Sequence, residues 1–261
     1  MTMIKTLGSL ALSGLGIAVF GTVLVEIAVA QEPEEWPVHS MERPRPRGVI
    51  VKGPVTTPPP ADAVVLFDGT SLGAWQGQGN DLPALWKVDH GYFEVAPGTG
   101  SIETKQSFGS VQLHLEWATP TPAEGEGQER GNSGVFLMGS YEIQVLDSYR
   151  NDTYPDGQAG AVYGQTPPLV NACLPPGQWQ SYDIVFHGPR FNPDSSVARP
   201  ARVTVFQNGV LIQDDVVITG QTVNGRKATY HPHPDRLPLA LQDHGKRVRY
   251  RNVWLRELGD S

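Results

Sequence analysis

The chain has 261 residues, of which 39% are hydrophobic and 18% charged, a composition that supports a large core and argues against a disordered protein. Its formal net charge is −7 and it has no long run of Lys or Arg, which argues against nucleic acid or an anionic membrane surface as a partner. The 29 Gly and 23 Pro residues are typical of many short strands joined by turns.

Residues 1–30 have the pattern of a signal peptide. Lys5 precedes an uncharged apolar stretch over residues 6–25, and Ala-Val-Ala at residues 28–30 supplies the small-x-small pattern of a signal-peptidase site. We expect cleavage after Ala30 and a secreted or periplasmic protein with no membrane contact after cleavage. The alternative is an uncleaved anchor, because the apolar stretch is nearly long enough to span a bilayer.

Residues 31–62 are rich in proline and charge, with Glu-Pro-Glu-Glu, Arg-Pro-Arg-Pro-Arg and Thr-Thr-Pro-Pro-Pro in succession. Repeated prolines remove backbone donors and favour extended conformations, so this segment is predicted to be a linker or an arm that follows the surface. The globular domain is predicted over residues 63–261, with no second domain and no internal repeat.

From residue 63 onward, alternating or β-branched runs predict about eleven strands, and no window shows a helical period. The runs are residues 64–67, 86–88, 92–95, 111–117, 134–138, 141–146, 179–186, 202–207, 210–212, 237–242 and 248–257. Asn208-Gly209 lies between two of them and predicts a type I′ hairpin, since both positions favour positive φ. Together these patterns predict an all-β protein, a jelly-roll sandwich of two antiparallel sheets.

The run at residues 141–146 carries the first candidate site. Alternation places Glu142 and Gln144 on one face and the hydrophobic residues on the other. A carboxylate and an amide bury no apolar surface, so their face is expected to meet a ligand or, alternatively, solvent alone. Asp147 falls outside the alternation, and a β-bulge at residues 145–146 would turn it onto the same face.

A second polar group lies near the C-terminus. Gln242 and His244 share a face opposite Leu239 and Leu241, and histidine is suited to proton transfer near neutral pH. A structural role at the end of a strand is the alternative for His244. Tyr163 lies near a turn in the glycine-bounded run 160–164.

The remaining candidates have simpler explanations. His231 and His233 could face one metal ion, but no third ligand is identifiable, so a loop is favoured. The single cysteine, Cys173, has no base beside it in the sequence and is interpreted as a packed thiol. Three tryptophans could stack on sugar rings, although core packing is the expected role; they are Trp75, Trp86 and Trp117.

Six motifs in chain order resemble the 3-keto-disaccharide hydrolase domain family. They are residues 66–75, 130–134 (Arg-Gly-Asn-Ser-Gly), 141–147 (Tyr-Glu-Ile-Gln-Val-Leu-Asp), 160–164 (Gly-Ala-Val-Tyr-Gly), 179–183 and 239–258. The resemblance implies a concanavalin A-like jelly roll that acts on 3-keto-glycosides by 1,2-elimination and hydration of the resulting 2-hydroxy-glucal. Residues 123–129 and 191–200 look peculiar to this chain, and we expect them to reshape the mouth of the cleft.

The implied reaction needs a base near C2, a donor to the developing enolate and an acid near the leaving oxygen. We expect Glu142 to be the base, His244 to share proton transfer or stabilise the enolate, and Asp147 to complete the catalytic set. Five further residues are expected to bind the carbohydrate: Arg130, Asn132, Gln144, Tyr163 and Gln242. No metal ligands are predicted, and the sequence leaves open whether a divalent metal polarises the ketone.

Two alternatives compete with this hypothesis. Glu142, Gln144 and Asp147 have the spacing of the Glu-x-Asp-x-x-Glu strand of laminarinase-like glycosidases, whose retaining mechanism needs two carboxylates about 5–5.5 Å apart. A noncatalytic sugar-binding module similar to lectin or laminin-G domains would have the same architecture.

Overall fold

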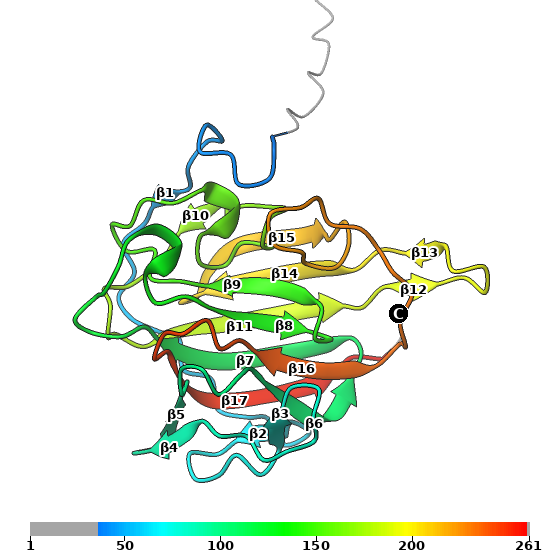
Figure 1. Ribbon diagram of the computed structural model, residues 1–261, viewed down its shortest axis with the longest axis horizontal. Coiled ribbons are helices and arrows are strands. Elements are labelled where there is room, and N and C mark those ends of the chain that lie inside the picture. Colours follow the sequence, from blue (N-terminus) through cyan, green and yellow to red (C-terminus); the bar gives the residue numbers. More distant parts are fainter. Residues whose placement is uncertain (1–35, 260–261) are drawn as a thin grey trace, which may run out of the picture. The chain divides into compact units, whose positions relative to one another are not determined.

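The computed structural model describes residues 36–259 (Figure 1). The predicted signal peptide lies outside this range. Residues from Trp36 onward form one compact unit. Helical structure in the described range is confined to two 3-10 turns, η1 (Gly127–Glu129) and η2 (Pro155–Gly157). Neither approaches the length and hydrophobicity that a bilayer-crossing helix needs, and no other described segment does.

The larger sheet has eight strands in the order β15-β14-β11-β7-β17-β5-β4, with β2 also paired to β17. All of its pairings are antiparallel. The strands are β2 (Val64–Phe67), β4 (Lys87–Asp89), β5 (Tyr92–Glu94), β7 (Val111–Ala118), β11 (Gln180–His187), β14 (Arg202–Gln207), β15 (Val210–Val217) and β17 (Arg249–Glu257).

The smaller sheet has five strands in the order β3-β6-β16-β8-β9, again antiparallel throughout. They are β3 (Trp75–Gly77), β6 (Ile102–Phe108), β8 (Ser133–Leu137), β9 (Tyr141–Val145) and β16 (Leu237–Leu241). In Figure 1 this sheet lies in front of the larger one, and the hydrophobic core fills the space between them. The predicted all-β sandwich of two antiparallel sheets is therefore confirmed.

Alternation along the strands explains how the core is built. In β11, Tyr182, Ile184 and Phe186 are fully buried, whereas the intervening residues 183 and 185 are partly exposed. Asn208 and Gly209, between β14 and β15, have φ values of 53° and 78°, as a type I′ turn requires. The sequence pattern thus sets both the inward face and the hairpin.

The aromatic and thiol candidates belong to this core. All three tryptophans, Trp75, Trp86 and Trp117, are buried. The expectation that they pack in the core is therefore confirmed, and their rings are not available to stack on a sugar. Cys173 is buried too, and burial raises the pKa of its thiol to about 11. A thiol held protonated in this way is a poor nucleophile.

Residues 36–62 lie against the sandwich as an arm. β1 (Arg47–Gly48) pairs in parallel with β10 (Val170–Asn171), and Val55 N donates to Ser181 Oγ at 3.0 Å. The indole Nε1 of Trp254 donates to the carbonyl of Thr57 at 2.9 Å. These contacts hold the described part of the segment along the surface of the sandwich.

Candidate active site

A cavity of about 180 Å³ opens beside β8 and β9, and we call it the Glu142 pocket. It is lined by Asn132, Phe136, Glu142, Gln144, Tyr163, Thr222, Asn224, Gln242 and His244. Six of the eight residues singled out from the sequence therefore meet in one place, although they come from four separate parts of the chain.

Glu142 lies on the pocket side of β9, where the strand is buried on both faces. Its carboxylate reaches over Gly134 of the neighbouring strand β8. A Cβ atom at residue 134 would collide with Glu142 Oε1 and with the ring of Phe136. Glycine at this position makes room for the carboxylate on the floor of the pocket.

The Glu142 carboxylate has almost no electrostatic compensation. It is 4% exposed, forms no ion pair within the described part of the chain, and burial raises its pKa to about 8. A carboxyl with a pKa this close to neutral can both accept and return a proton. Such a perturbed group in a cavity is typical of a functional site.

An amide network holds the wall around Glu142. The terminal amide atoms of Gln144 lie 3.0 Å from Gln128 Oε1 on one side and 3.0 Å from Glu142 Oε1 on the other. Asn132 Nδ2 donates to the carbonyl of Gln128 at 2.9 Å. Since Gln144 has only one amide nitrogen, Glu142 and Gln128 compete for it. The side-chain amide nitrogens of Asn132 and Gln144 thus already donate to protein oxygens, and these hydrogen bonds fix the wall of the pocket.

Gln242 and His244 come from the segment that follows β16. Gln242 N donates to the carbonyl of Gly134 at 3.0 Å, which extends the strand pairing one residue beyond β16. Its side-chain Oε1 is buried without a hydrogen-bond partner in the described range. His244 is exposed at the mouth of the pocket. The predicted shared face of these two residues therefore turns toward Glu142.

Tyr163 forms another wall. Its hydroxyl lies 2.8 Å from the hydroxyl of Tyr154 and donates to Asn224 Oδ1 at 3.2 Å. Burial raises the pKa of Tyr163. Behind it, His39 of the arm stacks on Tyr154 with ring centroids 3.9 Å apart. The arm thus supports the pocket from outside.

Sequence reasoning missed Thr222 and Asn224. The backbone N–H of Glu142 donates to Thr222 Oγ1 at 3.0 Å, which fixes this loop against β9. Asn224-Gly225 is a turn signal that could have located the loop, but nothing local indicates a contact with a strand 80 residues earlier. Phe136 was missed because it reads as an ordinary strand residue.

Arg130 and Asp147 lie elsewhere. β9 ends at Val145 in regular register with β8, so the bulge expected at residues 145–146 does not form. Asp147 turns away from the Glu142 pocket and accepts a hydrogen bond from Arg130 Nε at 2.7 Å. The structure therefore does not place Asp147 beside Glu142, because the strand's alternation stops before it.

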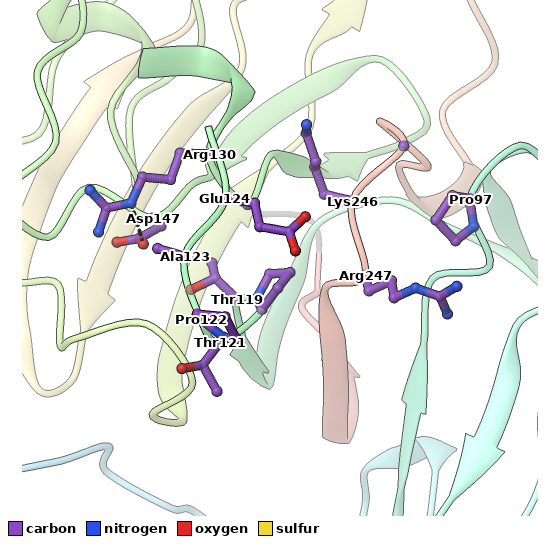
Figure 2. A pocket seen from close by; sticks show the side chains of 13 residues that line it. Pro97, Thr119, Thr121, Pro122, Ala123, Glu124, Arg130, Asp147, Lys246 and Arg247 are labelled. Carbon is purple, nitrogen blue, oxygen red and sulfur yellow. Dashed lines mark hydrogen bonds and ion pairs between the residues drawn. The ribbon is translucent and has the colours of Figure 1, made fainter. Parts of the chain in front are cut away.

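Both residues line a second cavity, of about 300 Å³, which we call the Arg130 pocket (Figure 2). The segment 123–129, which was expected to reshape the cleft, contributes two residues to its wall. The full lining is Pro97, Thr119, Pro120, Thr121, Pro122, Ala123, Glu124, Arg130, Gly131, Asp147, Gly245, Lys246 and Arg247.

The other segment expected to reshape the cleft, residues 191–200, does not do so. Most of it lies in the hairpin of β12 (Arg190–Phe191) and β13 (Val197–Arg199), which projects from the other end of the sandwich (Figure 1). None of its residues lines either pocket, so that expectation is wrong. An unusual sequence marks a surface insertion but does not say which end of the sandwich carries it.

The histidine pair at residues 231 and 233 is engaged by the protein. His233 Nε2 lies 2.6 Å from the hydroxyl of Tyr141, and His231 Nε2 lies 3.3 Å from Thr229 Oγ1. Among residues 36–259, no group of three or more His, Cys, Asp or Glu side chains is arranged to hold a metal ion.

Comparison with known proteins identifies the family. Residues 62–256 match the 3-keto-alpha-glucoside-1,2-lyase-like domain. The chain belongs to this family. The match spans both sheets and both pockets, and it confirms the family resemblance seen in the sequence. None of the curated proteins matches the chain.

Two solved structures from Parabacteroides distasonis are similar to this lyase-like chain, and both are named provisionally as glycosyl hydrolases. The first is 42% identical with a TM-score of 0.75, and the match covers 83% of this chain and 94% of the other. The second is 17% identical with a TM-score of 0.55, covering 76% and 94%, and it supports the fold alone.

Proposed function

We propose that this protein cleaves 3-keto-glycosides by removing the proton at C2, eliminating the C1 substituent and hydrating the product. The observation that carries the proposal is Glu142, a buried carboxyl without a cationic partner in the described range, whose pKa is raised to about 8. The family match supports the substrate class.

The first step uses the acidity that a ketone at C3 gives to the C2 proton. The Glu142 carboxylate takes this proton, and the electron pair forms an enolate whose charge rests on O3. The amide nitrogens of Gln242 and Asn224 have no hydrogen-bond acceptor within the described part of the chain and are suited to donate to O3. Asn132 and Gln144 hold the wall instead, because protein oxygens already accept from both of their amide nitrogens.

The second step breaks the bond from C1 to the glycosidic oxygen. The enolate electrons form the C1–C2 double bond, and the leaving oxygen takes a proton from His244 at the mouth of the pocket. Water then adds its oxygen to C1 and gives a proton to His244, while Glu142 returns its proton to C2. The net change is hydrolysis, and both groups end in their starting protonation states.

The two competing hypotheses have weaker support. A retaining glycosidase needs a second carboxylate near Glu142, but Asp147 lines the other pocket and pairs with Arg130 at 2.7 Å. A noncatalytic sugar-binding module has no use for a carboxyl whose pKa is shifted toward neutrality, since hydrogen bonding to a sugar does not require it.

The test compares a 3-keto-glycoside with its unoxidised parent, following release of the leaving group. We expect release from the keto substrate alone, with formation of the 2-hydroxy-glucal as intermediate, and loss of release in Glu142→Gln and His244→Ala. Release from the parent glycoside would support the glycosidase, and binding without release would support the sugar-binding module. A chelator added to the same assay tests for a divalent metal.

We also propose export of the protein, on the signal-peptide pattern of residues 1–30. Mass determination of the protein recovered from the cells and the medium tests this. A mature N-terminus at Gln31 supports cleavage, and an intact N-terminus supports the anchor.

A further inference from the structure

The backbone of Glu142 is held between two separate segments of the chain. Its N–H donates to Thr222 Oγ1 at 3.0 Å, and its carbonyl accepts from the N–H of Tyr163 at 3.2 Å. The Tyr163 hydroxyl in turn donates at 3.2 Å to Oδ1 of Asn224, which follows Thr222 by two residues. These contacts close a ring of residues that all line the Glu142 pocket.

The hydrogen bond from Tyr163 determines which end of the Asn224 amide can face the pocket. Because Oδ1 accepts from the tyrosine, Nδ2 is the free end, and it has no acceptor within the described part of the chain. This orientation suits the charge in the pocket, since the Glu142 carboxylate and a developing enolate attract an N–H group and repel an amide oxygen. Asn224 is exposed, so its side chain depends on this hydrogen bond for its orientation.

A count of protons fixes the direction of the chain of hydroxyl groups. Tyr163 has one hydroxyl proton and gives it to Asn224, so Tyr154 must be the donor in the 2.8 Å contact between the two tyrosines. If Tyr163 gave its proton to Tyr154 instead, it would have to accept from Asn224. The amide would then turn its oxygen toward the pocket.

Tyr154 is held in place by the arm and by the domain. The ring of His39 stacks on it with centroids 3.9 Å apart, and His39 N donates to the buried Asp156 carboxylate at 2.9 Å. On the domain side, the Tyr154 ring passes so close to Gly157 that a Cβ atom there would collide with it. These contacts fix the position of the Tyr154 hydroxyl.

We propose that Tyr163 is a positioning residue that points the Asn224 amide at the oxygen of the developing enolate, and that Tyr154 keeps Tyr163 in the donating direction. The inference rests on the proposed function, because the enolate is its target. It extends that function by connecting the arm to the stabilisation of the enolate. Tyr163 keeps its proton throughout, since burial raises the pKa of its hydroxyl.

A double-mutant cycle of Tyr163→Phe and Asn224→Ala, assayed with a 3-keto-glycoside, tests this role. Tyr163→Phe should lower kcat about tenfold, less than the roughly 10²–10³-fold loss of a deleted oxyanion donor, because the amide is still present. KM should stay within about twofold, since the oriented amide serves the enolate and not the bound ketone. In the Asn224→Ala background, Tyr163→Phe should have no further effect.

Tyr154→Phe should show the same pattern at a smaller amplitude. Tyr149→Phe is the matched control and should leave kcat unchanged, since it removes a tyrosine hydroxyl outside both pockets. Effects of Tyr163→Phe and Asn224→Ala that multiply in the double variant would overturn the proposal, because Tyr163 would then act independently of Asn224.

A measurement without turnover separates this inference from the proposed function. NMR relaxation of the Asn224 side-chain amide, assigned by its absence in Asn224→Ala, reports how firmly the amide is held. We expect a rigid amide in the unaltered protein and a mobile one in Tyr163→Phe. That result without cleavage of any 3-keto-glycoside would leave the orientation of Asn224 standing and remove the proposed reaction. Cleavage with an amide equally mobile in both proteins would leave the reaction and remove the positioning role.

Discussion

Two buried glutamates, Glu116 in β7 and Glu142 in β9, differ in their surroundings and in their pKa. Burial raises the pKa of both. At Glu116 this effect is outweighed by the nearby His114 ring and by hydrogen bonds from Asn252 and Arg251, and its pKa falls to about 2. At Glu142 burial acts without compensation, and the pKa rises to about 8.

The comparison separates a structural carboxylate, Glu116, from the carboxyl that we propose as the base, Glu142. Arg251 donates to Glu116 through Nε at 2.8 Å and forms an ion pair through its terminal nitrogen at 2.7 Å. Such a network is stable because each charge has a partner. A buried carboxylate without one costs stability, and positions of this kind are common at sites that perform chemistry.

The largest effect is expected from Glu142→Gln. The amide cannot take a proton from C2, so release from a 3-keto-glycoside should fall by about 10²–10⁴-fold, the usual contribution of a general base. The melting temperature should stay the same or rise, because burying the uncharged amide costs less free energy than burying the carboxylate. Assay and thermal unfolding of the same preparation test both points. Retained activity with a lowered melting temperature would make Glu142 a structural residue.

Glu116→Gln should show the opposite pattern. It leaves the positive charge of Arg251 without its partner, and we expect a loss of about 3 kcal/mol in the free energy of unfolding. Urea denaturation measures this loss, while kcat should change by less than about twofold, since Glu116 lies outside both pockets. Glu94→Gln is the control, because its looser pair with Arg247 at 3.4 Å should contribute no more than about 1 kcal/mol.

The pH dependence sharpens the contrast. If Glu142 acts as the base, kcat/KM should rise with pH and level off above about pH 8. The free energy of unfolding should depend on pH in the opposite direction. The folded pKa of Glu142 lies above its ordinary value of 4.5. The stability that Glu142 contributes is therefore complete below pH 4.5 and is lost as the pH rises through about 8. Glu142→Gln should remove this loss, and an unchanged pH profile of stability would contradict the assignment.

The smallest effect is expected at the arm. His39→Ala removes the stacking on Tyr154 behind the pocket, which should cost about 1 kcal/mol of stability. Because Tyr154 contacts Tyr163, kcat/KM should fall a few-fold as well. His39→Phe keeps a stacked ring and should restore both values. A loss of activity that His39→Phe does not restore would mean that the ring alone is insufficient.

The sequence was sufficient where strand alternation continues. Alternation placed Glu142 and Gln144 on one face of the strand, and the family resemblance added His244 to the candidate site. It failed at Asp147, because the strand ends at Val145 and the next residues follow no period. It also failed at Thr222 and Asn224, since a loop that packs on a strand 80 residues away leaves no local signal.

The arm has a consequence for the order of folding. Thr57 accepts a hydrogen bond from Trp254, 197 residues later in the chain. During synthesis the arm therefore emerges long before its docking surface on β17 exists. Because proline has no backbone N–H, the proline-rich arm offers few donors for premature strand pairing. The contact at Thr57 must therefore wait until the last strand is in place, so the arm is fully docked only when the whole sandwich is complete.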